Sequence, residues 1–223
     1  MVRAVIFDMD GLMFDTERLY DQAIEQAGNE LGYSGIADLS RDMIGVRETD
    51  CVPLYQKRFG SGFSYPLFAA RRQEIIDEFI RKNGVPVKPG LFELLRYLKQ
   101  GGFRLAVATA TSRRRASGYL EQTGAAGYFD RMIFGDMVEQ CKPSPEIYLK
   151  AAEALGAAAE DCIALEDSPC GIQAACAAGM KAVMIPDLIE PDAALRKLCW
   201  SCEPSLTDVI KLVGETRSEE GAV

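Results

Sequence analysis

Histidine is absent from this chain of 223 residues. Its absence excludes catalysis by Ser-His-Asp or Cys-His arrangements, phosphohistidine chemistry, and metal sites that use imidazole ligands. Any proton transfer must therefore use the side chains of Asp, Glu, Lys, Tyr or Cys.

Long apolar runs are also missing. No segment approaches the ~18 apolar residues of a membrane span, and the run before Asp8 is too short for the apolar core of a signal peptide. Lys and Arg number 25 against 33 Asp and Glu, which gives a net charge of −8 and disfavours non-specific binding to nucleic acid or anionic membranes. We expect a cytoplasmic protein with neither nucleic acid nor a membrane as partner, and a monomer as the default state.

Two motifs that would define other protein classes are incomplete or absent. Cys199 and Cys202 form one CxxC, but no second pair and no histidine stands at a spacing that completes a tetrahedral zinc site. A thioredoxin-like CxxC follows the first strand of its fold, whereas this one lies near the C-terminus. We interpret these thiols as reduced and incidental, with a redox role left open. No GxGxxG follows the first strand, which argues against a dinucleotide-dependent oxidoreductase.

Two carboxylates stand at the end of the first apolar run of the chain. The run 4–7 leads directly into Asp8, Met9, Asp10 and Gly11. Alternate residues of a strand point to the same side, so Asp8 and Asp10 are expected to point together beyond the carboxyl end of this strand. At roughly 4–6 Å, two negative charges repel by several kcal/mol unless a cation or a proton intervenes. Because stability does not favour this arrangement, it indicates chemistry.

Four further apolar runs alternate with helical patterns along the rest of the chain. These runs predict strands at 103–108, 131–134, 162–165 and 181–185. Apolar residues at helical spacing lie between them, at 91–98 and 147–155, and Ser144-Pro145 and Ser168-Pro169 predict helix starts. The alternation predicts an α/β fold with a Rossmann-like parallel sheet and right-handed crossovers.

One long helical segment interrupts this alternation just after the first strand. Its apolar residues repeat at helical spacing from Leu19 to Leu31 and again near Ile75 to Ile80, and the segment returns through a Pro/Gly-rich stretch at 84–90. We predict that residues 1–15 and 84–223 form the α/β core and that residues 16–83 form an inserted helical cap domain. The two connections would then act as hinges.

The polar residues with chemical potential follow the predicted strands. They are Asp8, Asp10, Thr109, Lys142, Glu166 and Asp167. Open α/β sheets bind ligands at the carboxyl ends of their strands, so these side chains should converge. Each close pair of carboxylates costs about 4 kcal/mol at an effective dielectric of 20, and Mg²⁺ with its preference for oxygen ligands would compensate. With a lysine and a hydroxyl for phosphoryl oxygens, the set predicts phosphoryl transfer through an aspartyl-phosphate.

At this point the sequence resembles the haloacid dehalogenase superfamily, in its branch with a helical cap near β-phosphoglucomutases and small-sugar phosphatases. Four motifs carry the resemblance in order: DMDGLMFDTE, VATAT, CKPSPEIY and LEDSPCGIQAA. The resemblance implies that Asp8 is the nucleophile and that Asp10 is first the general acid and then the base. It further implies that Thr109 and Lys142 hold the phosphoryl oxygens.

The same resemblance implies a metal site and a set of substrate contacts. Mg²⁺ would be held by Asp8, by Asp10 through its backbone carbonyl and by Asp167, with Glu166 in or near its shell. The phosphate or the remainder of a small phosphorylated metabolite, which we expect to be a sugar phosphate, would be bound by a further set of residues: Gly11, Thr16, Ala110, Gly45 and Arg47. Arg47 fits an exposed ion pair with Glu48 as well, and that alternative stays open.

Departures from the family pattern bear on the reaction. Cys141 stands where relatives often have glycine, so we hypothesise that its oxidation inactivates the protein. Ile44 and, approximately, Tyr20 stand where β-phosphoglucomutases typically have lysine and histidine. A mutase must hold a bisphosphate and shield the aspartyl-phosphate from water, so we expect a phosphatase rather than a mutase. A catalytically silent binding module is a further alternative, and Asp10 argues against a 2-haloacid dehalogenase.

Overall fold

The computed structural model describes the backbone of residues 2–41 and 48–220 and the side chains of residues 2–40 and 51–216. The chain divides into two compact units, one formed by Met1–Asp15 with Val87–Val223 and the other by Thr16–Pro86. The division therefore falls within the Pro/Gly-rich stretch 84–90, three residues after the boundary drawn from the sequence.

The first unit is built on a six-stranded parallel sheet with the order β3-β2-β1-β4-β5-β6. The strands are β1 (Ala4–Phe7), β2 (Arg104–Ala108), β3 (Arg131–Ile133), β4 (Cys162–Glu166), β5 (Lys181–Met184) and β6 (Ser201–Cys202). The predicted α/β fold and parallel sheet are confirmed, with strand ends shifted by one residue at most. The two-residue strand β6 was not predicted, because two residues carry no periodicity.

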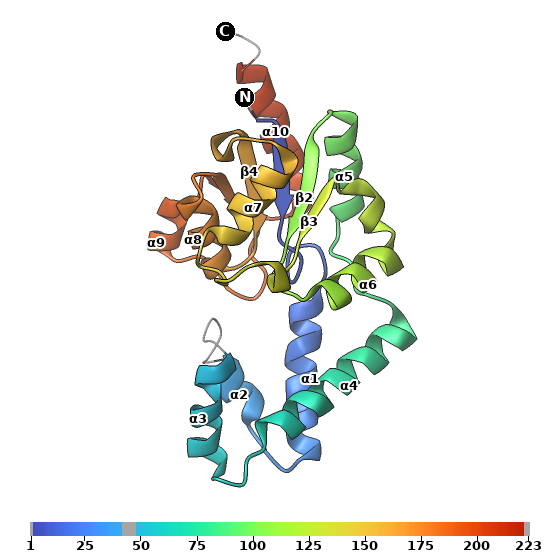
Figure 1. Ribbon diagram of the computed structural model, residues 1–223, viewed down its shortest axis with the longest axis vertical. Coiled ribbons are helices and arrows are strands. Elements are labelled where there is room, and N and C mark those ends of the chain that lie inside the picture. Colours follow the sequence, from blue (N-terminus) through green and yellow to red (C-terminus); the bar gives the residue numbers. More distant parts are fainter. Residues whose placement is uncertain (1, 42–47, 221–223) are drawn as a thin grey trace. The chain divides into compact units, whose positions relative to one another are not determined.

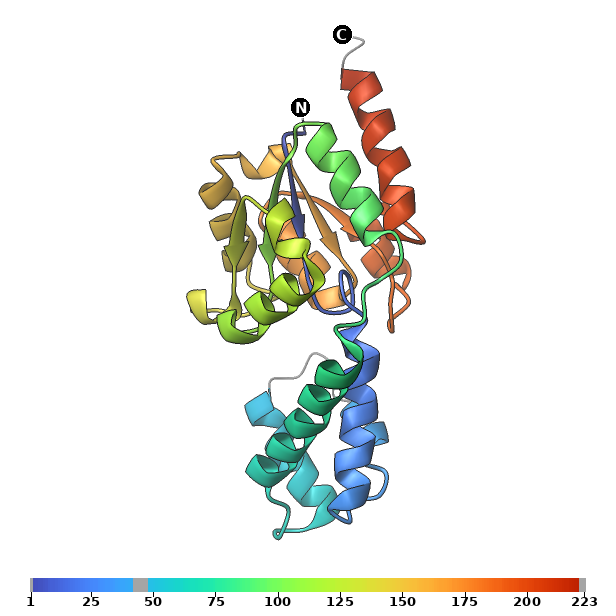
Figure 2. The ribbon, with the colours of Figure 1, turned by 90° about the vertical axis from the view of Figure 1, so that its right-hand side faces the viewer.

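Helices cover both faces of this sheet (Figures 1 and 2). They are α5 (Leu91–Gln100), α6 (Arg113–Thr123), α7 (Glu146–Leu155), α8 (Pro169–Ala177), α9 (Ala193–Leu198) and α10 (Leu206–Glu220), with short 3-10 turns at Ala125–Tyr128, Gly135–Met137 and Ala159–Asp161. Helices α7 and α8 pack on one face, and Figure 2 shows α5 and α10 side by side on the other. Alternation along the strand explains why both faces of the sheet are covered. Ala4 and Ile6 of β1 belong to the core under α7 and α8, whereas Val5 and Phe7 point to the opposite face of the sheet.

Of the two serines predicted to cap helices, one does so and the other does not. Ser168 caps α8 as expected, since its hydroxyl oxygen accepts the backbone N–H of Gly171 at 3.1 Å. Ser144 does not cap α7, which begins at Glu146; its hydroxyl accepts only a long 3.4 Å bond from the Glu146 N–H. A pattern of serine followed by proline thus located both helices to within two residues but did not fix the capping group.

The second unit is helical in its described part. It contains α1 (Thr16–Glu30), α2 (Ile36–Arg41), α3 (Glu48–Phe59) and α4 (Tyr65–Asn83), and α1 packs along α4 (Figure 1). Beside its aliphatic core lies an aromatic cluster: ring centroids lie 4.8–6.5 Å apart among Tyr33, Tyr55, Phe59, Phe63, Tyr65 and Phe68. Among the described helices of both units, none is long and apolar enough to cross a membrane.

Candidate active site

A buried acidic cluster lies where β1 and β4 end. These strands are neighbours in register, with Phe7 beside Leu165, so the residues that follow them, Asp8 and Glu166, come out side by side. Each of Asp8, Glu166 and Asp167 offers a carboxylate oxygen, and these oxygens all lie within 4.8 Å of one another. All three side chains are buried, with Glu166 completely inaccessible. Three like charges in a buried space must be compensated by a cation or a proton.

Lys142 supplies one positive charge to this cluster. Its Nζ donates to Asp8 Oδ1 and to Glu166 Oε1, both at 2.5 Å, and to the carbonyl oxygen of Ala108 at 3.1 Å. Burial alone would lower the pKa of the Lys142 ammonium, but the two carboxylates outweigh burial and raise this pKa above its ordinary value. Lys142 therefore stays charged, and one ammonium faces three carboxylates.

Asp8 shows the electrostatic consequence. Burial raises the pKa of its carboxyl from 3.8 to about 8, and the charges of Glu166 and Asp10 add to this rise, while Lys142 opposes it. The ionised form of Asp8 is thus costly in the protein alone. A divalent cation beside it would favour ionisation, and a donor set of carboxylate oxygens fits a hard divalent ion.

The Asp10 carboxylate points to a different set of partners. Its Oδ2 accepts the hydroxyl of Thr111 at 2.7 Å and the hydroxyl of Thr109 at 3.3 Å. The turn that begins at Gly11 allows this, because Gly11 has a φ of +80° that favours glycine, and its N–H donates to the carbonyl of Phe14. The Asp10 carboxylate does not belong to the acidic cluster above. The predicted contribution of Asp10 to a metal site is through its backbone carbonyl, and it stays a prediction.

Glu166 is held by residues that the sequence did not single out as part of the site. The hydroxyl of Tyr148 donates to its Oε1 at 2.6 Å, and the hydroxyl of Ser168 donates to its Oε2 at 3.0 Å. A Cβ at Gly171 would lie 1.9 Å from the Glu166 carboxyl group, so α8 can approach this closely only with glycine. Both oxygens of Glu166 therefore accept protein hydrogen bonds.

The missed residues all lie inside the motifs VATAT, CKPSPEIY and LEDSPCGIQAA, but no property of the sequence assigned them to the site. Tyr148 stands on the apolar face of α7, where periodicity assigns it to the core. Ser168 was assigned only a capping role, and Thr111 follows a motif threonine by two positions. Tertiary contacts made these three hydroxyls part of the site.

The other predicted substrate contacts are distributed as follows. Ala110 is exposed just after β2, and Gly11 lies in the turn after β1. Thr16 is buried at the start of α1 in the helical unit. Gly45 and Arg47 lie outside the described residues. These assignments stay predictions.

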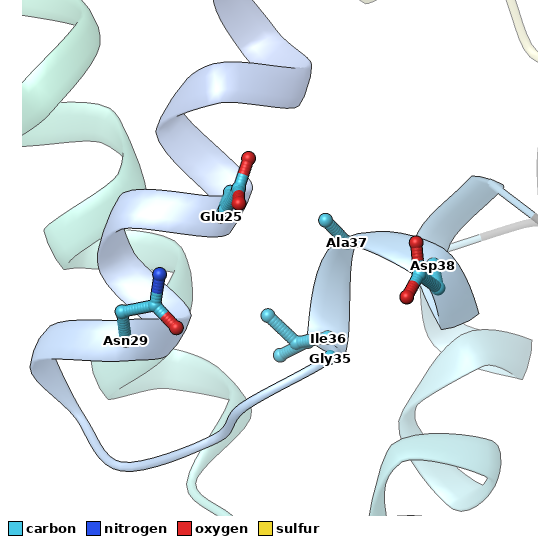
Figure 3. Close-up of a pocket in the computed structure, with 6 residues that line it drawn as sticks. All are labelled: Glu25, Asn29, Gly35, Ile36, Ala37 and Asp38. Carbon is cyan, nitrogen blue, oxygen red and sulfur yellow. The ribbon is translucent and has the colours of Figure 1, made fainter.

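A hollow in the helical unit is separate from the acidic cluster. It is lined by Glu25 and Asn29 of α1 and by residues 35–38 at the start of α2, as Figure 3 shows. It shares no residue with the cluster, and its lining is polar and open. Its side chains suggest no reaction.

Comparison with known proteins identifies the family. Residues 5–185 match the haloacid dehalogenase-like hydrolase family. The chain belongs to this family. It is 36% identical over 186 residues to the phosphorylated carbohydrates phosphatase of Thermotoga maritima. The aligned region covers 82% of this chain and 84% of that protein. This chain is 31% identical over 196 residues to hexitol phosphatase B of Escherichia coli, covering 83% and 84% of the two chains.

Solved structures agree with this family assignment. A candidate β-phosphoglucomutase from Thermotoga maritima superposes with a TM-score of 0.80 at 31% identity, covering 96% of this chain and 99% of that one. CbbY from Rhodobacter sphaeroides, solved with phosphate, gives a TM-score of 0.77 at 27% identity over 94% and 96%. The resemblance drawn from the four motifs is confirmed, and the buried cluster of this family member is consistent with a divalent metal.

Proposed function

We propose that this protein is a Mg²⁺-dependent phosphatase that hydrolyses a small phosphorylated carbohydrate, such as a sugar or sugar-alcohol phosphate. One observation carries the proposal: the buried carboxylate of Asp8 lies in an acidic cluster beside the ammonium of Lys142, at 2.5 Å. The names of the relatives support the substrate class, since one acts on phosphorylated carbohydrates and another on hexitol phosphates.

The proposed reaction has two steps on Asp8. In the first, a carboxylate oxygen of Asp8 attacks phosphorus, the P–O bond to the sugar breaks, and Asp10 gives its proton to the leaving alkoxide. In the second, Asp10 takes a proton from water as the water oxygen attacks the phosphorus, the P–O bond to Asp8 breaks, and inorganic phosphate leaves with the Asp8 carboxylate restored. The hydroxyl of Thr111, which donates to Asp10 Oδ2 at 2.7 Å, would hold that carboxylate in one orientation.

The remaining groups would stabilise charge. Lys142 and Thr109 would bind the phosphoryl oxygens. Mg²⁺ would be held by the carboxylates of Asp8 and Asp167 and by the Asp10 carbonyl, and when bound it supplies positive charge to the phosphoryl group. Glu166, with both oxygens already hydrogen-bonded, would act beside the metal as the counter-ion of Lys142.

Substrate selectivity would come from the helical unit, through Thr16, Gly45 and Arg47, acting as a cap that excludes water during the first step. We further propose a cytoplasmic monomer without a nucleic-acid partner. Size-exclusion chromatography with light scattering tests the oligomeric state.

A mutase is the second candidate, because a solved relative is described as a candidate β-phosphoglucomutase. Ile44 and the absence of histidine favour hydrolysis instead. The test is phosphate release from a panel of sugar, hexitol and other metabolite monophosphates, with Mg²⁺ and with EDTA. Mg²⁺-dependent release from a few phosphorylated carbohydrates supports the proposal. Conversion of β-glucose 1-phosphate to glucose 6-phosphate faster than phosphate release would establish the mutase, and a folded protein inactive in both assays would refute both.

A further inference from the structure

The loop that carries Lys142 is tied to the first residue of the helix that follows it. This loop runs from the 3-10 turn Gly135–Met137 to α7. The carboxylate of Glu146 accepts the backbone N–H of Glu139 at 3.0 and 3.1 Å and the backbone N–H of Gln140 at 2.8 Å. One side chain at the start of α7 thereby closes the loop on itself, with Lys142 between the two tied ends.

A second tie comes from one turn further along α7. Lys150 Nζ donates to Glu146 Oε1 at 2.7 Å and to the carbonyl oxygen of Met137 at 2.8 Å. Lys150 and the two backbone donors lower the pKa of Glu146 to about 2, so its carboxylate is charged at neutral pH. The pair fixes the loop at Met137, Glu139 and Gln140, all on the N-terminal side of Lys142.

Lys142 depends on where its backbone is held. Its ammonium must meet Asp8 and Glu166 at 2.5 Å each, and a lysine side chain has considerable rotamer freedom to lose. A loop without fixed ends would spread the ammonium over many positions, whereas a misplacement of 1 Å costs on the order of 10²-fold in rate. The groups that hold Lys142 in place therefore bear on the chemistry.

We infer that Glu146 is a positioning residue, which acts by clamping the loop so that the Lys142 ammonium reaches Asp8 and Glu166. This inference rests on the proposed function of Lys142. The competing explanation is that Glu146 only places a negative charge at the N-terminus of α7, where it would stabilise the helix through its dipole.

The experiment compares Glu146→Ala and Glu146→Gln with Glu153→Ala, a control at an exposed glutamate of the same helix. It measures kcat/KM for Mg²⁺-dependent phosphate release and hydrogen–deuterium exchange of the segment 138–143. We expect Glu146→Ala to lower kcat/KM by about 10- to 100-fold and to speed exchange in this segment, with Glu153→Ala within about twofold of wild type. Glu146→Gln should recover most of the activity, because its amide oxygen still accepts the backbone N–H groups. A pure dipole effect requires charge, so Gln would then behave like Ala.

A double-mutant cycle tests whether Glu146 acts through Lys142. In a Lys142→Ala background, measured by single turnover at high enzyme concentration, Glu146→Ala should change the residual rate by less than about twofold. An undiminished effect in that background would overturn the inference, as would exchange in 138–143 that matches the Glu153→Ala control. If the wild type hydrolyses no phosphate ester, the proposed function fails, while the exchange comparison still decides whether Glu146 clamps the loop.

Discussion

The two units of this chain differ in how their aromatic side chains are arranged, in separate pairs in the α/β unit and in one cluster in the helical unit. The core under α7 and α8 in the α/β unit is largely Ala, Ile and Leu, which lets helices approach a flat parallel sheet closely. The helical unit also buries aliphatic side chains, among them Leu19, Ile24 and Ile76, but in addition it gathers six aromatic rings into one cluster, of which three are buried. Large rings fill the space between a few short helices, where small aliphatic side chains would leave voids.

The two units also differ in the polar side chains that they bury. Among the described side chains of the α/β unit the buried polar residues are Asp8, Thr109, Glu166 and Asp167, all at the carboxyl ends of strands. In the described part of the helical unit they are Thr16 and Arg72, and the Arg72 guanidinium lies 4.5 Å from the centre of the Tyr20 ring. The α/β unit thus concentrates charge that needs a ligand or a metal, while in the helical unit the buried guanidinium is packed on aromatic rings. The comparison assigns the chemistry to the α/β unit.

The largest expected effect is the loss of turnover in Asp8→Asn. An amide cannot form the aspartyl-phosphate, so phosphate release should fall by at least about 10⁴-fold. Since Asn is neutral and close in size to Asp, the melting temperature in EDTA should be unchanged or higher at neutral pH, where Asp8 is largely protonated, and higher above pH 8, where Asn removes a clustered negative charge. Activity is followed by phosphate release and folding by thermal denaturation. Turnover near the wild-type rate would break the assignment of chemistry to this cluster.

Truncation in the aromatic cluster should act on stability instead. Phe63 is 3% exposed and contacts five other rings, so Phe63→Ala should destabilise the helical unit by about 3–5 kcal/mol. Mg²⁺ binding by the α/β unit, measured by calorimetry at a temperature where the variant is folded, should be unchanged. Phe79→Ala serves as the control, because Phe79 is 36% exposed in α4 and should cost much less. Loss of Mg²⁺ binding in Phe63→Ala would contradict the division of roles.

Two glycine substitutions sharpen the same comparison. An added Cβ at Gly171 meets the Glu166 carboxyl group at 1.9 Å, and one at Gly28 meets an Ile36 methyl group at 2.1 Å. Both Ala variants should lose about 1–3 kcal/mol of stability through overpacking. Gly171→Ala should also lower kcat by displacing Glu166 and Lys142, whereas Gly28→Ala should keep kcat near wild type. Gly118→Ala is the control, since its Cβ would meet no described atom within 4 Å. Equal kcat values for the first two variants would count against a site confined to the α/β unit.

The last prediction is a pH dependence of the stability of the metal-free protein. The pKa of Asp8 is raised to about 8 in the folded state, chiefly by burial, from an ordinary value of 3.8. The folded state therefore holds a proton that the unfolded state releases, so this group's contribution is present below pH 4 and is lost as pH rises to about 8. Thermal denaturation in EDTA should show wild type losing more stability than Asp8→Asn between pH 5 and 8. Parallel profiles for the two proteins would show that Asp8 is ionised throughout.

Most of the strands and several residues of the candidate site could be predicted from local sequence patterns. Apolar runs located five of the six strands, because a buried parallel strand requires a continuous apolar run. The motif residues Asp8, Lys142 and Glu166 converge because parallel strands place their carboxyl ends at one edge of the sheet. β6 was missed, since two residues carry no pattern, and the predicted capping of α7 by Ser144 was wrong, because the helix begins at Glu146 without a side-chain cap.

The sequence by itself determined the family, the parallel sheet and the absence of imidazole chemistry, and it singled out Asp8, Lys142 and Glu166 as members of the candidate site. Only the tertiary structure decided which groups hold the reacting side chains: Tyr148 and Ser168 on Glu166, Thr111 on Asp10, and Glu146 on the loop before Lys142. The physical reason is that strand and helix periods are local properties of the chain. A hydrogen bond between α7 and β4, or between a loop and a helix, depends instead on distances that exist only after the sheet and its helices have packed.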